Sequence, residues 1–345
     1  MPARKDLQEY VKNELPYAIL MKLYENSRAS LQAMGREFGV SYHTVAAALQ
    51  KMEEKYNISY TLQLDERKLG FTNGMMLMIK FERMPDLSSL KERLRGDIYV
   101  QDAYIGSGDF DLILYVVGLE IVDFDKWRFK LETDLFEYSP VVKFYLVDQI
   151  HLGFFPISSE LIMESASLNP LEKKVLALLN ENSRIKLTEL VKKTKSTQTK
   201  VLYTIRKMKK EGIIKKFTML VQNPEKKLYM AYGMSHMPSR EHDKLLLQYL
   251  KLIVSEDLHE VSNDYSLITD GIGHYGSFYI CNFKDSEEAQ KHGPDMLYSL
   301  WAPEHFKAEK AILTDLIKGK WPFHLESYET QKRYIKDIES KLSHS

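Results

Sequence analysis

The feature that most constrains this chain is a repeat within its own sequence. Residues 25–28, Glu-Asn-Ser-Arg, return as residues 181–184, which is an offset of 156. Apolar positions keep the same offset over about thirty residues: Leu31 with Leu187, Val45 with Val201, Leu49 with Ile205 and Met52 with Met208. A shared register of apolar positions indicates a shared fold. The 345 residues are therefore predicted to hold two copies of one structural plan.

Each copy begins with a pattern of three helices. In the second copy, Asn169 is a good N-cap and Pro170 suits the first helical position. In the first copy, Pro16 has a similar opening role. Residues 30–38 and 187–193 are then expected to form short helices.

A longer helix follows each short one after a brief turn. Ser41 in the first copy and Thr197 in the second are suited to cap these longer helices. Two helices joined by a turn of three or four residues form a helix-turn-helix. Residues 58–64 and 213–221 are rich in β-branched and aromatic side chains, which predicts the strands of a wing after each one.

The remainder of each copy alternates strands and helices in the ferredoxin-like order β-α-β-β-α-β. In the first copy, these elements are expected at residues 75–81, 87–94, 99–105, 112–117, 124–136 and 141–146. In the second, they are expected at residues 229–237, 241–254, 258–268, 275–283, 286–301 and 306–313. The predicted fold class is α+β, with two ferredoxin-like domains that pair within the chain while each keeps its own sheet.

These elements divide the chain into five segments. We predict a winged helix at 1–70, a ferredoxin-like domain at 71–160, a second winged helix at 166–222, a second ferredoxin-like domain at 223–321 and a tail at 322–345. An additional helix is expected at residues 5–14. In the tail, Tyr334, Ile338 and Leu342 recur at a spacing of four, which indicates an amphipathic helix.

Charge is divided unevenly between the two copies, although 48 Lys and Arg balance 48 Asp and Glu overall. Residues 1–165 carry 19 basic and 25 acidic side chains, and the remaining residues carry 29 basic and 23 acidic ones. The two copies are therefore expected to have different electrostatic roles. A single cysteine, Cys281, and the lack of a long apolar run predict a soluble, cytoplasmic protein without a membrane partner.

The excess of positive charge is concentrated at residues 192–216, which hold ten Lys or Arg and one acid, Glu211. A run of charge is usually a solvated helix face. Placement on a predicted recognition helix and wing favours a second interpretation, because binding of double-stranded DNA needs clustered cations where the phosphate backbone passes. The predicted DNA contacts of the second copy are Gln198, Thr199, Lys200, Tyr203, Arg206, Lys207 and Lys210.

The first recognition helix differs in character. Residues 46–48 are all alanine, and Glu53 and Glu54 place negative charge near its end. The predicted polar contacts of this copy are Tyr42, His43, Thr44, Gln50 and Lys51. Small side chains permit close approach to thymine methyl groups, but the same composition suits a packing or protein-contact module, and both interpretations stay open.

This organisation resembles the leucine-responsive, or Lrp/AsnC, family of transcription regulators. The resemblance is carried by Ile19-Leu20, Leu23 and residues 25–28, then Ser41 and Thr44-Val45, and then Ile58, Tyr60-Thr61, Leu64-Asp65 and residues 68–71. Residues 108–111, Gly-Asp-Phe-Asp, look like the G-x-[YF]-D turn of the family's ligand-responsive domain. It covers nearly the whole chain, as two tandem copies where most members have one.

The resemblance implies several further properties. It implies that Gly108, Asp109 and Asp111 bind a small effector such as an amino acid, although Gly and Asp are also ordinary turn formers. In the second copy, residues 273–276 read Gly-His-Tyr-Gly, so any second site must differ in chemistry. The family fold also implies pairing of the ferredoxin-like domains and homo-oligomers built through them. RNA polymerase machinery is a further predicted partner, in case the chain acts as a protein-interaction module.

Two other classes of function stay open. Sirohaem decarboxylases resemble the same architecture, and His236, His259 and His274 lie on or beside neighbouring predicted strands. Against that class, no cluster rich in Arg and His faces one pocket. A protein-interaction module of the transcription machinery is the third class, which the acidic first half and the tail would suit. The ten histidines and one cysteine show no metal-ligand spacing, so no metal, other cofactor or catalytic residue is predicted.

Overall fold

The computed structural model describes residues 15–71, 73–118, 120–222, 227–235, 244, 247, 265–294 and 307–319. The expected helix at 5–14, nearly all of the one at 241–254 and the amphipathic tail lie outside these residues. The chain divides into two compact units. One comprises the residues up to Leu69 together with Ile162–Pro224, and the other comprises Gly70–Leu161 and the residues from Glu225 onward.

The first unit contains both helix-turn-helix copies. Their helices are α2 (Leu15–Glu25), α3 (Leu31–Glu37) and α4 (Tyr42–Lys55) in one copy, and α8 (Pro170–Glu181), α9 (Leu187–Thr194) and α10 (Gln198–Lys210) in the other. The expected caps are confirmed for the long helices, because the Ser41 hydroxyl accepts from the backbone N–H of Thr44, and that of Thr197 accepts from Lys200. These caps satisfy N–H groups that have no partner within the helix. A short helix, α7 (Ser159–Glu164), was not predicted.

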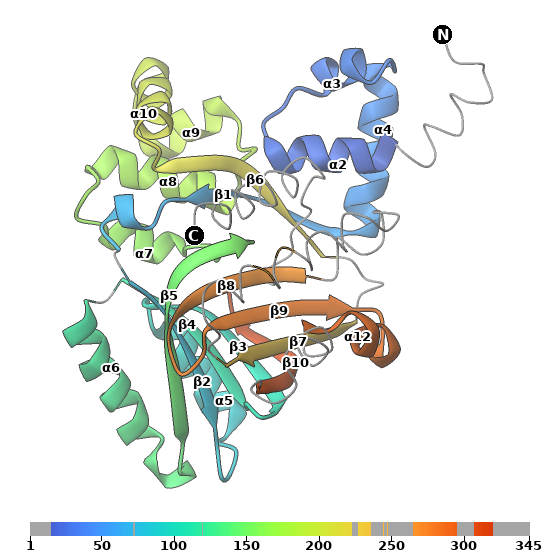
Figure 1. Ribbon diagram of the computed structural model, residues 1–345. Coiled ribbons are helices and arrows are strands. Elements are labelled where there is room, and N and C mark those ends of the chain that lie inside the picture. Colours follow the sequence, from blue (N-terminus) through green and yellow to red (C-terminus); the bar gives the residue numbers. More distant parts are fainter. Residues whose placement is uncertain are drawn as a thin grey trace. The chain divides into compact units, whose positions relative to one another are not determined.

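The strands expected to form separate wings pair with each other instead. β1 (Asn57–Leu64) and β6 (Ile214–Gln222) form a two-stranded antiparallel ribbon shared by the two copies (Figure 1). Thr61 of one copy lies opposite Thr218, its equivalent in the other. Each copy has one strand here, and the equivalent strand of the other copy supplies hydrogen-bond partners for it.

The repeated tetrapeptide forms the contact between the two copies. Ser27 Oγ and Ser183 Oγ are buried and lie 2.6 Å apart. Arg28 Nη1 donates to the carbonyl oxygen of Ser183 at 2.8 Å, and Arg184 Nη1 donates to that of Ser27 at 3.1 Å. The exchange of equivalent contacts shows that a pseudo-two-fold axis relates the copies.

The second unit contains eight strands and three α-helices among the described residues. The first half contributes β2 (Gly74–Lys80), α5 (Leu87–Gly96), β3 (Val100–Gly108), β4 (Leu112–Val117), α6 (Ile121–Asp134) and β5 (Val141–Leu152). The second half contributes β7 (Leu228–Met234), β8 (Tyr265–Gly273), β9 (Ser277–Phe283), α12 (Ser286–His292) and β10 (Ala308–Lys318). The described part of β8 extends five residues beyond the predicted end at residue 268, and residues 258–264 are not described.

The strands of both halves join into one closed barrel in the order β10-β3-β4-β2-β5-β8-β9-β7 (Figure 1). Within each half the four strands keep the ferredoxin-like arrangement, so the predicted fold class is confirmed. The expectation that each half keeps its own sheet is wrong, because β3 pairs with β10 and β5 pairs with β8. Closure leaves no unpaired strand edge in the barrel.

Both faces of β2 are buried. Met75, Leu77 and Ile79 belong to the core that includes side chains of α5 and α6, while the alternating Met76 and Met78 are also fully buried. Because side chains alternate along a strand, Met76 and Met78 point to the barrel interior. This explains why the segment is a continuous apolar run rather than an alternating one.

Candidate nucleic-acid interface

The second recognition helix, α10, has a clearly divided surface. Val201, Thr204 and Met208 are buried, at spacings of three and four residues that place them on one face. The side chains of Gln198, Thr199, Lys200, Tyr203 and Arg206 are exposed. Tyr203 is 68% exposed, which is high for an aromatic residue in the middle of a helix. The exposed face therefore presents an amide, a hydroxyl, a phenol and two cations.

Lys207 on the same helix is already held within the protein. Its Nζ donates to Glu172 Oε1 at 2.6 Å, and Glu172 is nearly buried at the start of α8. Glu172 also accepts from the backbone N–H of Asn169, which completes a capping box. The bond to Glu172 raises the pKa of Lys207 above its ordinary value. Lys207 thus ties α10 to α8, a role that the sequence prediction of a DNA contact did not include.

Several other cations in residues 192–216 also have partners in the protein. Lys215 lies 3.8 Å from Asp65, and Lys193 lies 3.0 Å from Glu189. Lys216 Nζ lies 3.6 Å from the centroid of the Tyr24 ring. On α10, Lys200, Arg206 and Lys210 are exposed. These three are the best-placed described cations for phosphate contact on this helix.

The first recognition helix, α4, has fewer cations and more internal contacts. Tyr42 is 49% exposed, and its ring makes an edge contact with that of His43 at 5.5 Å. The hydroxyl groups of Ser41 and Thr44 are 2.9 Å apart, so Thr44 is part of the cap. The structure brings Tyr42 and His43 together at the exposed start of the helix.

The end of α4 carries its negative charge on the surface. Gln50 Nε2 donates to Glu54 at 3.0 Å, and the hydroxyl of Tyr60 donates to Glu53 at 2.5 Å. Lys51 is exposed between these two acids and the alanine segment. Nearby carboxylates weaken the attraction of Lys51 for phosphate.

The turn with the predicted effector residues is occupied by contacts within the barrel. Gly108 has a φ of 140°, and a Cβ there would meet the carbonyl oxygen of Lys310 at 2.5 Å. Asp109 donates its N–H to that carbonyl oxygen at 2.8 Å and accepts from the Lys310 N–H at 2.8 Å. Asp111 accepts from Lys80 Nζ at 2.7 Å and from the N–H of Phe81 at 2.9 Å. Both carboxylates thus stabilise the turn.

The histidines do not meet in one pocket as far as they are described. His274 contacts the backbone of Phe144, and His151 Nε2 lies 2.6 Å from Asp270 Oδ2. His236 and His259 lie outside the described residues. Within the described part of the chain, no group of three or more His, Cys, Asp or Glu is placed to hold a metal ion. None of the described helices is long and apolar enough to cross a membrane.

Sequence comparisons agree with the helix-turn-helix assignment. A family described as winged helix-turn-helix DNA-binding matches residues 168–215, which contain α8, α9 and α10. YugG of Bacillus subtilis, an uncharacterized HTH-type transcriptional regulator, is 31% identical over 110 residues, or 30% of this chain and 66% of YugG. Regulatory protein AsnC of Haemophilus influenzae is 28% identical over 112 residues, or 32% of this chain and 75% of AsnC. The chain thus spans just under two thirds of YugG.

A structural comparison covers more of the chain at lower identity. The siroheme decarboxylase NirDL has a TM-score of 0.58, with 13% identity, and the match covers 95% of this chain and 100% of that one. At such identity the likeness establishes the fold and nothing more.

Fold and interface together define a protein with two winged helix-turn-helix copies and paired ferredoxin-like halves. In both its helix-turn-helix sequence and its fold, the chain is similar to helix-turn-helix regulators such as AsnC.

Proposed function

We propose that this chain is a cytoplasmic transcription regulator that binds double-stranded DNA through its winged helices, with α10 as the principal reader. The observation that supports this most is the exposed face of α10, where Gln198, Lys200 and Tyr203 stand beside Arg206. Gln pairs in two-point fashion with adenine, and Lys and Arg pair with guanine. Lys200, Arg206 and Lys210 supply the cations for phosphate contact.

A DNA titration tests this proposal. Each phosphate contact contributes about −0.9 to the slope of log K against log salt. We expect the wild-type protein to bind random duplex DNA, and the triple change Lys200→Ala, Arg206→Ala and Lys210→Ala to make that slope shallower by up to about 2.7. A suitable control is Lys291→Ala, a change at an exposed lysine on α12. Absence of duplex binding at low salt, or an unchanged slope in the triple variant, would contradict the proposal.

The first winged helix has the weaker part in this proposal. Tyr42, His43 and Thr44 are at the start of α4, where side chains reach base edges in a helix-turn-helix. Its remaining surface carries alanines and two acids, and within this fully described helix the exposed cations are Lys51 and Lys55 alone. We therefore assign α4 a contact with thymine methyl groups, and α10 most of the electrostatic affinity. An asymmetric operator follows from two readers that differ.

Effector control is a finer part of the proposal. The effector would be an amino acid whose ammonium group replaces Lys80 as the cation facing Asp111. Thermal unfolding with a panel of amino acids tests this, since a ligand that binds the folded state raises the melting temperature. The stabilisation should disappear in Asp111→Asn while Asp123→Asn keeps it. If no amino acid stabilises the wild-type protein, the turn has a structural role only.

Homo-oligomer formation is proposed through the exposed surface of α6 and the 3-10 turn Phe136–Tyr138 that follows it. Val122 and Phe129 on α6 are each 68% exposed, Phe136 at the start of the turn is 79% exposed, and the three recur every seven residues. Such a stripe is self-complementary when two copies pack antiparallel, because Phe129 then meets itself and Val122 meets Phe136. Light scattering should show a smaller assembly for Phe129→Glu than for Lys126→Glu, a change at an exposed residue on the same helix. An unchanged mass for both would remove this surface from the proposal. Contact with RNA polymerase machinery is a further proposal, which goes with a role as a protein-interaction module.

The second candidate function is that of a sirohaem decarboxylase-like enzyme. This candidate rests on the fold that the chain shares with NirDL over 95% of its length. The two functions differ in a simple observation, because an enzyme of this kind binds tetrapyrrole and absorbs visible light after reconstitution. Tight spectral titration with sirohaem, together with no binding to duplex DNA at low salt, would favour the enzyme.

A further inference from the structure

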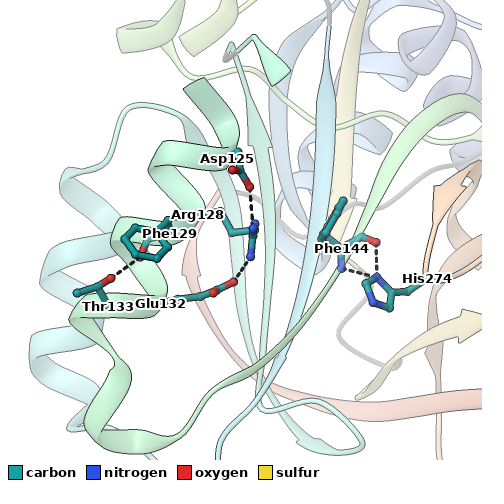
Figure 2. A network of polar contacts seen from close by, with 7 residues as sticks. All are labelled: Asp125, Arg128, Phe129, Glu132, Thr133, Phe144 and His274. Atoms are coloured by element: carbon teal, nitrogen blue, oxygen red, sulfur yellow. Dashed lines mark hydrogen bonds and ion pairs between the residues drawn. The ribbon is translucent and has the colours of Figure 1, made fainter. Parts of the chain in front are cut away.

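The ferredoxin-like halves meet at a second pseudo-two-fold axis. His274 follows β8 as Asp109 follows β3, and each grips a strand of the other half. The backbone N–H of His274 donates to the carbonyl oxygen of Phe144 at 3.1 Å. His274 Nδ1 lies 3.2 Å from the backbone nitrogen of Phe144 and 3.0 Å from its carbonyl oxygen (Figure 2). Asp109 contacts the same two backbone groups of Lys310, through its own N–H and its carboxylate. Phe144 on β5 and Lys310 on β10 are thus equivalent positions.

The Phe144 side of this contact is also held by α6. Figure 2 shows Arg128 between Asp125 and Glu132, one turn on either side of it on that helix. The guanidinium carbon of Arg128 lies 5.7 Å from the centre of the Phe144 ring. Phe144 is therefore held by His274 through its backbone and by Arg128 through its ring. These two contacts fix the register between the halves.

The residues that immediately precede Phe144 and Lys310 carry opposite charges. Lys143 precedes Phe144, and Glu309 precedes Lys310. Lys143 Nζ lies 2.5 and 2.6 Å from the two carboxylate oxygens of Glu309, and each side chain is about one third exposed. Equivalent positions from the two halves thus contact each other directly.

Tyr275 reinforces this ion pair. Its hydroxyl group donates to Glu309, and its ring makes an edge contact with the ring of Phe110 at 6.0 Å. Burial raises the pKa of Glu309, but the bonds from Lys143 and Tyr275 outweigh burial and lower it overall. The carboxylate is therefore held ionised against the lysine.

The charges have a consequence for which halves can pair. Two first halves would bring Lys143 against a second Lys143, and two second halves would bring Glu309 against a second Glu309. Like charges at a partly desolvated contact disfavour the wrong partner. We propose that Lys143 and Glu309 form a pairing code, by which the first ferredoxin-like half accepts the second half and rejects a copy of itself.

On the axis between the winged helices, the contacts are the same from either copy, because Ser27 faces Ser183 and Thr61 faces Thr218. Away from this axis, Lys216 lies 3.4 Å from Glu25 and Lys215 lies 3.8 Å from Asp65, so weaker unlike pairs also join these copies. The shorter contact of Lys143 with both oxygens of Glu309 makes the barrel the stronger source of discrimination. The code keeps one α4 and one α10 in each assembly, and it excludes mixed barrels in which two first halves pair. The proposal does not depend on DNA binding.

Charge reversal in the full chain tests the stability side of the code. Lys143→Glu places two carboxylates together, and Glu309→Lys places two ammonium groups together. We expect each to lower the melting temperature by about 3 to 6 °C at low salt, and the double swap Lys143→Glu with Glu309→Lys to recover at least half of that loss. The control is Lys291→Glu, within the exposed pair on α12, with a change below about 1 °C. Single reversals without effect, or a swap no better than either, would overturn the proposal.

Co-expression tests the choice of partner directly. The Lys143→Glu chain carries glutamate at both positions, and the Glu309→Lys chain carries lysine at both. Within each variant chain the two halves carry like charges and repel each other. A half of one variant and a half of the other variant carry opposite charges and attract each other. With a different affinity tag on each, we expect these two variants to co-purify at least about threefold more than two tagged wild-type chains. Equal co-purification in the two experiments would show that the charges do not select the partner.

Discussion

The two winged helices share their contact side and differ on their outer side. On the contact side, each repeated serine bonds to the strand of the other copy. The N–H of Ser27 donates to the carbonyl oxygen of Phe217 on β6, and the N–H of Ser183 donates to that of Tyr60 on β1. The Arg28 guanidinium lies over the Phe217 ring, and that of Arg184 over the Tyr60 ring. The outer faces of α4 and α10 have little in common. Residues at the contact between the copies have therefore stayed alike, whereas residues on the outer faces of α4 and α10 have diverged.

One pair of equivalent lysines shows the divergence most clearly. Lys51 and Lys207 are separated by the repeat offset of 156. Lys207 is bound to Glu172, whereas the position equivalent to Glu172 in the first copy is Pro16. Lys51 is exposed. The same residue type therefore fastens two helices in one copy and stands on the surface in the other.

The largest expected effect comes from removing the carboxylate that only the second copy has. Glu172→Ala removes the capping box of α8 and the closest carboxylate partner of Lys207, which keeps only the 3.8 Å contact with Glu211. We expect a loss of about 2 to 4 kcal/mol in the free energy of unfolding, measured in urea. Glu189→Ala removes the exposed partner of Lys193 and should cost at most about 0.5 kcal/mol. Equal losses would mean that the buried pair has no special role.

The symmetric contact should respond equally from either side. Arg28→Ala and Arg184→Ala each remove one hydrogen bond to a serine carbonyl oxygen and one contact with an aromatic ring. We expect each to lower the free energy of unfolding by about 1 to 2 kcal/mol. Arg36→Ala, at an exposed position on α3, serves as the control with little change. A large inequality between the two variants would break the proposed equivalence of the copies.

Acid should weaken the second winged helix through Glu172. Burial raises the pKa of this carboxyl group, but the bonds from Lys207 and Asn169 lower it more, so the folded pKa lies below the ordinary value. Its stabilising contribution is therefore complete above the unfolded pKa of about 4.3 and is lost as the pH falls through the lower folded value. The urea midpoints of wild type and Glu172→Ala should therefore converge as the pH falls below the unfolded pKa of about 4.3 and through the lower folded pKa. A constant gap between the two would contradict this assignment.

The smallest effects concern the two equivalent lysines in DNA binding. Lys207→Ala should change the salt slope by less than about 0.3, because its ammonium group is engaged by Glu172. Lys51→Ala should make the slope shallower by less than about 0.9, since Glu53 and Glu54 offset its field. DNA titration at several salt concentrations measures both. A slope change near 0.9 for Lys207→Ala would show that the lysine leaves Glu172 to contact phosphate.

Much of this structure was predictable because its signals are local. Ser41 and Thr197 cap their helices through N–H groups three residues away, and Asn169 with Pro170 marks the start of α8 as expected. The order of strands and helices in the first ferredoxin-like half follows from side-chain periodicity alone. The partner of Lys207 also had a local signal, since Asn169 followed by Glu172 is a capping-box spacing.

The sequence by itself determined the duplication, the helix caps and the β-α-β-β-α-β order, because each depends on residues a few positions apart or on a repeated register. Tertiary structure alone decided that β1 pairs with β6 and that the two sheets close into one barrel. It also decided that Lys143 meets Glu309, 166 residues away. The periodicity of apolar residues indicates which face of a strand is buried. It does not indicate which other strand pairs with each of its two edges. Those choices depend on backbone hydrogen-bond partners and charges that come together only when both copies have folded.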